Sequence, residues 1–343
     1  MKQMTIGIGL TGDCNYNCTH CYSSKERGRM LPFEYLEKLV STGLISSVNF
    51  GTGESILYPR FREAVSLFAS NNIKVGLTTN GTTVAALDED CMRKFNDIDF
   101  SLDFPSSEMH DSLRGIGAYE NVLDGINRCQ IMGIPCSLAM CLSKQNRDYS
   151  SEMLRLAADL DVYLRINIYK GTHPQYRLSN EQFWQSVTSL INRSYIVSCS
   201  EPVILPLLPY KSLNMRATTN ALSVRIRPDG MIMPCVYWET PCLTLSNILH
   251  LNPEQLLRKL EEYDSRSQKH LIPAECVDCK YCDTCKGGCA CRRQYKDIKL
   301  RDEYCVLLNS ELPVWDYSYI ESDTLVHADY LCTIIVKGGR YEN

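Results

Sequence analysis

The sequence lacks the features of membrane-spanning and secreted proteins. None of its apolar runs is long enough to span a bilayer, and its first residues, MKQMTIGIGL, contain neither the apolar core nor the small-residue cleavage site of a signal peptide. It also lacks an excess of basic charge, because 36 Lys and Arg residues face 40 Asp and Glu residues and the net charge is −4. We therefore expect a cytoplasmic protein that binds neither a membrane nor nucleic acid.

Cysteine is the residue in clear excess, with 18 copies in 343 residues. Disulfide-rich secreted scaffolds are short, whereas this chain is long enough for two domains with separate cores. We therefore expect reduced thiols, many of them bound to metal.

Strand-like and helix-like segments alternate through the first half of the chain, which predicts a parallel sheet covered by helices. The predicted strands span 4–10, 46–50, 73–79, 98–103, 134–141 and 162–169, and the predicted helices span 31–44, 59–70, 89–95, 119–132, 149–160 and 180–191. Six strand–helix units are too few for a closed eight-stranded barrel, so we expect an open (β/α)6 partial barrel. Its ligand site is expected where the C-terminal ends of the strands meet.

Three cysteines follow the first predicted strand directly. Cys14, Cys18 and Cys21 stand in a C-x3-C-x2-C pattern within TGDCNYNCTHCYSS. Three thiolates this close can bind three irons of one [4Fe-4S] cluster and leave the fourth iron without a protein ligand. The alternatives are a zinc site or three unrelated thiols.

This stretch resembles the radical S-adenosylmethionine (radical SAM) superfamily. The resemblance implies that the amino and carboxylate groups of S-adenosylmethionine occupy the open iron, and that an electron from the cluster cleaves it to a 5'-deoxyadenosyl radical. His20 stands where that family usually has an aromatic residue near the adenine.

Further phrases at predicted strand ends resemble the same family. Thr52-Gly53-Glu54 stands at a Gly-Gly-Glu position, and SLDFP with the following HD, R and GIGAYENV resembles the SLDGP branch that includes sulfatase-maturating enzymes. Together with position in the barrel, the resemblance implies that S-adenosylmethionine is bound by His20, Thr52, Gly53, Glu54, Asn80, Ser101, Asp103 and Arg165. For Arg165, a structural salt bridge is the alternative.

The second half of the chain carries another group of cysteines. Pro202, Pro206 and Pro209 mark a linker, and a hairpin is expected over 222–227 and 231–235. We therefore divide the chain into a barrel at 1–200, a cysteine-rich domain at 201–310 and a tail at 311–343, which packs on that domain or near the barrel mouth.

The pattern C-x2-C-x5-C-x3-C with a later cysteine resembles the SPASM extension, which implies two auxiliary [4Fe-4S] clusters. The outer cluster would be bound by Cys276, Cys279, Cys285 and Cys305, and the inner cluster by Cys235, Cys242 and Cys289. The usual fourth inner cysteine is absent after Ser246-Asn247-Ile248. The inner cluster therefore has an open iron, which we favour, or it takes His250, Cys282 or Cys291. A pair of zinc knuckles is the alternative to both clusters.

The remaining thiols lie in apolar contexts and are expected to be buried small hydrophobes. They are Cys91, Cys129, Cys136, Cys141, Cys199 and Cys332. Cys141, at the C-terminal end of a strand, is the best placed of them to donate a hydrogen atom to a substrate.

The resemblance implies a radical SAM enzyme that oxidatively modifies a ribosomally made peptide or a protein, for instance by forming a cross-link or a thioether. Expected partners are a flavodoxin- or ferredoxin-type electron donor and a separate leader-binding protein, because the first strand starts at residue 4. Alternatives are radical dehydrogenation of a small alcohol such as an aminoglycoside, and a pure iron–sulfur electron carrier. Strand-end motifs disfavour the carrier, since electron transfer needs no ligand site.

Overall fold

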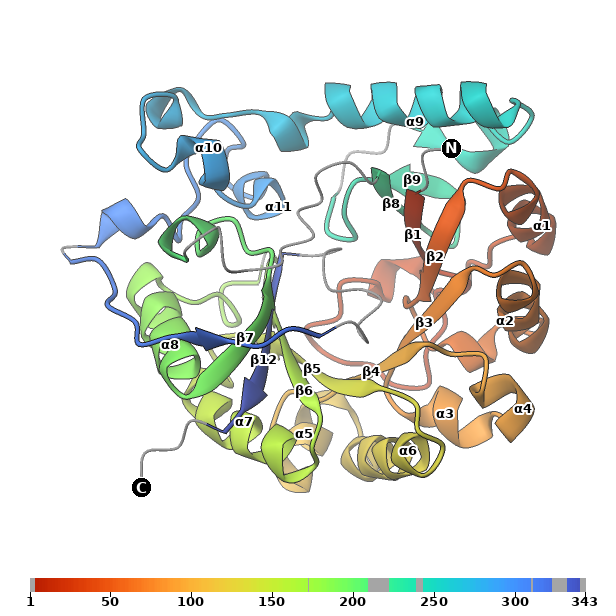
Figure 1. Ribbon diagram of the computed structural model, residues 1–343, viewed down its shortest axis with the longest axis horizontal. Helices are drawn as coiled ribbons and strands as arrows, with labels where there is room; N and C mark the ends of the chain where they lie inside the picture. The colour runs from red at the N-terminus through yellow and green to blue at the C-terminus, as the bar shows by residue number, and fades with distance from the viewer. Residues whose placement is uncertain are drawn as a thin grey trace.

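The computed structural model describes residues 4–171, 173–208, 222–238, 243–309, 311–322 and 332–339, and in these ranges the strands form one curved sheet (Figure 1). The strands are β1 (Met4–Ile8), β2 (Ile45–Phe50), β3 (Lys74–Thr79), β4 (Asp97–Ser101), β5 (Cys136–Leu142), β6 (Tyr163–Ile168), β7 (Ser194–Cys199), β8 (Leu222–Ile226), β9 (Met231–Met233), β10 (Leu243–Thr244), β11 (Ser318–Tyr319) and β12 (Thr333–Gly338). Their order in the sheet is β10-β9-β8-β1-β2-β3-β4-β5-β6-β12-β7-β11.

Helices α1 to α8 cover the outer side of the barrel strands, whereas α9, α10 and α11 lie apart from them (Figure 1). The helices are α1 (Phe33–Ser41), α2 (Phe61–Ser70), α3 (Thr82–Ala86), α4 (Glu89–Met92), α5 (Ser107–Arg114), α6 (Ala118–Ile131), α7 (Ser150–Asp159), α8 (Asn180–Asn192), α9 (Pro253–Arg266), α10 (Cys282–Cys285) and α11 (Ala290–Arg293). α9 belongs to the second half of the chain and is separate from the helices that cover the barrel strands (Figure 1).

Strands β1 to β6 are parallel and lie side by side in chain order. Each is rich in apolar residues, and Ile6, Val48, Leu77, Phe100 and Leu164 are at most 1% exposed. Near-continuous burial of this kind is expected of parallel strands covered on their faces. The predicted partial barrel is confirmed.

The second half of the chain extends the barrel sheet at its first strand. β8 pairs with β1 in parallel, and the antiparallel strand β9 follows after the turn Pro228-Asp229-Gly230. The predicted hairpin is therefore confirmed. It brings Cys235 and Tyr237 close to the ends of the barrel strands.

The tail contributes a strand to the interior of the barrel sheet. β12 lies between β6 and β7 and is antiparallel to both, with Thr333 opposite Asn167 and Ile334 opposite Cys199. Because β12 runs in the opposite direction, its first residue lies at the edge where β6 and β7 end. Cys332 is thereby carried to the site edge of the barrel.

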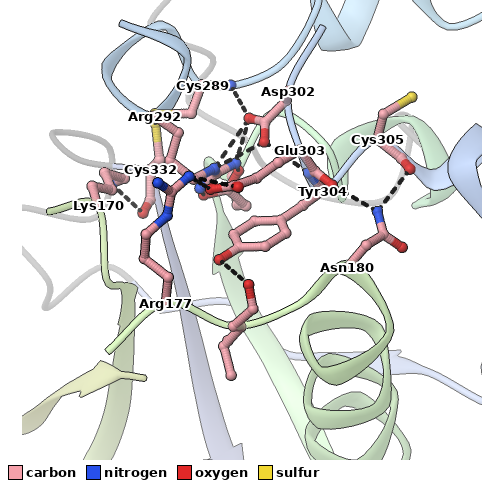
Figure 2. A network of polar contacts seen from close by, with 12 residues as sticks. Lys170, Arg177, Asn180, Cys289, Arg292, Asp302, Glu303, Tyr304, Cys305 and Cys332 are labelled. Carbon is pink, nitrogen blue, oxygen red and sulfur yellow. Dashed lines mark hydrogen bonds and ion pairs between the residues drawn. The ribbon is translucent and has the colours of Figure 1, made fainter. Parts of the chain in front are cut away.

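A buried ionic network ties the cysteine-rich segment to Glu201, two residues after the end of β7 (Figure 2). The guanidinium of Arg292 contacts Glu201 at 2.5 Å and Asp302 at 2.7 Å, and all three side chains are at most 2% exposed. Next to it the ring of Tyr304 stacks on Phe183 of α8, with centroids 4.4 Å apart. The two halves therefore share one packed interface, and the proposed division at residue 200 stays a prediction.

No helix in the described ranges combines the length and the apolar character that crossing a bilayer requires.

Candidate functional site

A cavity of about 220 Å³ lies at the C-terminal ends of the barrel strands. The three N-terminal cysteines line it, together with side chains from β2 to β6 and from the second half. Seven residues predicted to bind S-adenosylmethionine also line it, namely His20, Thr52, Gly53, Glu54, Asn80, Ser101 and Arg165. Residues far apart in the sequence thus meet in one site.

The start of the cysteine loop is held by the segment that follows it, at Arg27 and Gly28. Arg27 donates to the carbonyl oxygen of Cys14 at 3.3 Å, and Gly28 N–H donates to the carboxylate of Asp13 at 2.8 Å. Burial raises the pKa of Cys18 to about 11. A buried thiol of this kind gives up its proton when a metal binds, so the loop fits a metal centre held by Cys14, Cys18 and Cys21.

Gly53 occupies a position that only glycine fits. Its φ is +64°, and a Cβ there would lie 2.4 Å from the carbonyl oxygen of Asp13 and 2.6 Å from that of Thr11. The β2 end can therefore approach the cysteine loop closely. Glu54 N–H completes this contact by donating to the Asp13 carbonyl oxygen at 2.8 Å.

The Glu54 carboxylate is fully engaged with the loop after β3. It accepts from the backbone N–H groups of Asn80 at 3.1 Å and Thr83 at 2.9 Å, and from the hydroxyls of Thr79 and Thr83. Burial raises the pKa of this carboxyl group despite those bonds. Glu54 thus fixes the shape of the neighbouring loop.

Asn80 is the residue that this arrangement aims at the cysteines. Its side-chain amide lies 3.7 Å from the Cys14 sulfur and donates to the Asn15 side chain at 2.9 Å. Its own oxygen accepts from Thr82 N–H at 3.0 Å, which closes the turn into α3. The amide is therefore pre-positioned as a donor beside the cysteine loop.

Asp103 lies behind the cavity wall. Its carboxylate accepts from Arg114 at 2.7 Å and from Cys141 N–H at 2.8 Å, and His20 approaches it at 3.5 Å. Burial alone would raise the pKa of Asp103, but Arg114 and the two histidines outweigh it and lower the pKa to about 2. Asp103 is absent from the cavity lining, whereas its partners His20 and Arg114 belong to it. It therefore orients these two.

His110 contacts the backbone of Asp103 and is fully buried. Its Nδ1 accepts from Asp103 N–H at 3.1 Å, and burial lowers its pKa to about 4. An unfolded histidine binds its proton near pH 6.5, so between pH 6.5 and 4 only the unfolded chain is protonated. We expect the free energy of unfolding to fall by up to about 3 kcal/mol as the pH drops through this window.

Urea unfolding at several pH values tests this expectation. His110→Gln should flatten the slope between pH 6.5 and 4, and the same change at the exposed His173 should leave it as in the wild type. Equal slopes for all three proteins would contradict the assignment.

Arg165 is ion-paired and also lines the cavity. Its Nε lies 3.1 Å from the Asp99 carboxylate, and both side chains are at most 7% exposed. The hydroxyl of Ser137 donates to the same carboxylate. Arg165 therefore forms the salt bridge that the sequence left open and also lines the cavity, while its role as a ligand-binding residue stays a prediction.

The second half supplies part of the cavity wall, which the sequence analysis did not predict. Tyr237 and Arg225 line the cavity. The ring centroid of Tyr237 lies 5.2 Å from that of Tyr22, the residue that follows Cys21. The Tyr22 hydroxyl lies 3.2 Å from that of Thr52. Aromatic residues flanking Cys21 and Cys235 were the available signal, but nothing in their spacing indicated that they would meet.

The four thiols predicted for the outer site lie around one small cavity. Cys276, Cys279, Cys285 and Cys305 line a space of about 20 Å³, together with Cys282. Gly287, with a φ of +81°, turns the chain beside it, where a Cβ would lie 2.4 Å from Pro273. This set of donors fits a cluster bound by cysteine thiolates.

For the inner site, Cys235 and Cys289 lie close together, while Cys242 is outside the described residues. Of the three alternative ligands, Cys291 lies between Cys235 and Cys289, Cys282 lies at the outer site, and His250 is exposed. Within the described ranges no group of three or more His, Cys, Asp or Glu side chains is arranged to hold a single metal ion. An iron–sulfur cluster does not require several side chains around one metal ion, because each iron is bound by its own thiolate.

Comparison with known proteins agrees with these features. Residues 8–157 match the model of the Radical SAM superfamily. The chain is 23% identical over 336 residues to the mycofactocin maturase MftC of Mycobacterium tuberculosis (strain CDC 1551 / Oshkosh), covering 88% of this chain and 82% of that protein. It is 25% identical to the subtilosin biosynthesis protein AlbA of Bacillus subtilis (strain 168), covering 82% of this chain and 65% of that one.

Two solved structures share the fold. Streptococcus suis SuiB bound to S-adenosylmethionine superimposes with a TM-score of 0.65 at 16% identity, covering 89% of this chain and 77% of SuiB. anSMEcpe with bound AdoMet and a Cp18Cys peptide gives a TM-score of 0.69 at 20% identity, covering 88% of this chain and 94% of that one. These likenesses extend beyond the barrel into the second half of the chain.

Proposed function

We propose that this chain is a radical SAM enzyme that reductively cleaves S-adenosylmethionine and oxidatively modifies a peptide, because residues 8–157 match the model of the Radical SAM superfamily. The observation that carries this proposal is the single cavity lined by Cys14, Cys18 and Cys21 and by the polar ends of β2, β3 and β6. A pure electron carrier has no use for such a cavity.

Cys14, Cys18 and Cys21 would hold the cluster that binds S-adenosylmethionine. When bound, this cluster supplies the electron that cleaves S-adenosylmethionine to a 5'-deoxyadenosyl radical, which takes a hydrogen atom from the substrate. The chain's own residues then orient the reactants and exclude water.

The ligand-binding side chains have distinct tasks in this proposal. The backbone at Thr52 and Gly53 and the amide of Asn80 offer hydrogen bonds beside the cysteine loop, while Glu54 holds that loop in place. Arg165 and Ser101 offer polar groups on the opposite wall for the carboxylate and ribose hydroxyls of the ligand. His20 would lie near the adenine, and Asp103 keeps His20 and Arg114 in position.

A peptide is the substrate that the relatives favour. Mycofactocin maturase is similar to this chain over most of its length, and a SuiB structure of the same fold is bound to its precursor peptide SuiA. The cavity is walled by both halves, so a substrate reaching it contacts Tyr237 and Arg225 as well as the barrel. Conversion of a side chain to a cross-link or thioether requires net loss of electrons, for which auxiliary clusters offer a route.

The proposal also includes the auxiliary clusters, an electron donor, a protein that presents the leader peptide, and the cellular compartment. The outer cluster is held by Cys276, Cys279, Cys285 and Cys305. A flavodoxin- or ferredoxin-type protein supplies electrons, and a separate protein presents the leader of the precursor peptide. The abundance of thiols suits the reducing cytoplasm, where we place the reaction.

The test uses reconstituted protein without oxygen, S-adenosylmethionine, a chemical reductant and short peptides encoded near its gene. We expect 5'-deoxyadenosine and a peptide that has lost two hydrogen atoms, identified by mass spectrometry. Oxidation of an aminoglycoside or another small alcohol in place of the peptide would shift the substrate assignment. No 5'-deoxyadenosine despite intact clusters would instead indicate an electron carrier.

A further inference from the structure

Four thiols from three separate segments meet beside the cavity. The Cys332 sulfur, just before β12, lies 3.5 Å from that of Cys289, just before α11. The thiol of Cys291, in α11, is in hydrogen-bonding contact with those of Cys289 and Cys235. The four sulfurs thus form one continuous group, buried among Met233, Trp238 and Ala290.

The position of Cys332 is fixed by the sheet. Thr333 pairs with Asn167 of β6, and its N–H donates to the Ser200 hydroxyl at 3.2 Å just after β7. Cys332 therefore projects past the ends of two barrel strands toward α11 (Figure 2). Its carbonyl oxygen accepts from Lys170 at 3.3 Å, which ties the same residue to the segment after β6.

The charge around these thiols favours anionic sulfur. Lys170 is 2% exposed, and the Glu201 carboxylate in its surroundings is ion-paired with Arg292, not with the Lys170 ammonium group. The ammonium instead lies near Cys235, Cys289 and Cys332 and 5.4 Å from the Tyr237 ring. A buried cation is costly unless negative charge compensates it, and metal-bound thiolates supply that charge.

The backbone of the same segment is held rigidly. Cys289 N–H donates to the Asp302 carboxylate at 2.7 Å, and that carboxylate is bound in turn by Arg292. Gly288, with a φ of +91°, gives Asp302 room to approach, because a Cβ there would lie 2.2 Å from the Asp302 side chain. A site whose ligands are locked in this way is suited to hold a rigid metal cluster.

We propose that Cys291 and Cys332 bind the inner auxiliary cluster together with Cys235 and Cys289. Each thiol gives up its proton, each iron receives a thiolate from the chain, and no iron is open to substrate. The inner site is then completed by the C-terminal strand, in contrast to the open iron that the sequence favoured. This inference rests on the proposed function only in taking the inner group to be an iron–sulfur cluster.

Iron and sulfide content tests the proposal without relying on activity. In a chain with Cys14, Cys18 and Cys21 changed to alanine, two auxiliary clusters hold about eight irons. Adding Cys332→Ala or Cys291→Ala should lower this to about four, or leave an altered cluster with a new electron paramagnetic resonance signal. Cys235→Ala is the positive control, and Cys199→Ala, which removes a buried thiol on β7, is the negative control.

Chemical rescue separates ligation from folding. Reconstitution of Cys332→Ala with added 2-mercaptoethanol should restore the wild-type iron content and spectrum, because a small thiol can replace the lost ligand. The same treatment should not change Cys199→Ala. Unchanged iron and spectra in Cys332→Ala before any thiol is added would overturn the proposal, as would zinc in place of iron at this site.

The two proposals fail independently. Formation of 5'-deoxyadenosine by the wild-type chain depends on the N-terminal cysteines, whereas the iron count is made with those cysteines removed. A normal iron count with no 5'-deoxyadenosine would reject the enzymatic proposal alone.

Discussion

Changing Cys14, Cys18 and Cys21 together to alanine is expected to abolish 5'-deoxyadenosine formation and to remove about four irons per chain. The three thiols line the cavity in which the other candidate ligand-binding side chains meet. Alanine has no side-chain group that can bind iron, so the triple substitution removes all three proposed ligands. The rate of 5'-deoxyadenosine release, measured by chromatography, and the iron content are the two readouts.

Cys91→Ala serves as the matched control, because it removes a buried thiol of α4 outside both cysteine groups. It should keep the full iron content and rate. If the triple variant kept its turnover, the cavity described here would not be the reaction site.

Changing Arg292 to alanine is expected to lower the free energy of unfolding by about 3–5 kcal/mol. The guanidinium is the shared partner of Glu201 and Asp302, and removing it leaves two buried carboxylates uncompensated. Net stabilities of folded proteins are only about 5–15 kcal/mol, so a loss of this size is a large fraction of the total. Because Asp302 also holds Cys289 N–H, the auxiliary iron content should fall as well.

Arg301→Ala provides the comparison at an exposed ion pair. Arg301 and Glu275 are each about one third exposed, and such pairs contribute at most about 1 kcal/mol. Anaerobic urea unfolding should therefore separate the two variants clearly. Similar losses for both would show that the buried network does not stabilise the fold as described.

The barrel could be predicted from sequence because its signals are local. Strands such as Ile45–Phe50 and Lys74–Thr79 mix apolar and small polar residues and are followed by loops that contain glycine, and the predicted strand positions differ from the observed ones by a few residues. The candidate ligands at the strand ends followed from that prediction, since parallel strands present their C-terminal ends at one edge.

What the sequence could not indicate depends on contacts between distant segments. The run TIIVKG predicts a strand but does not say that it enters the sheet between β6 and β7. Cys332 stood in an apolar context typical of a buried thiol, and only that strand order brings it to Cys289. In the same way, Asp103 alternates onto the ligand face in the sequence, but Arg114 and the Cys141 N–H hold its carboxylate behind the cavity wall.

The strand order of β12 also constrains how the chain folds as it is synthesised. Thr333 bonds to Ile166, 167 positions earlier, so the barrel sheet is completed only after nearly all of the chain has left the ribosome. Until then, β6 and β7 present hydrogen-bonding edges to other nascent or misfolded chains. We therefore expect this long-range pairing to slow the final step of folding.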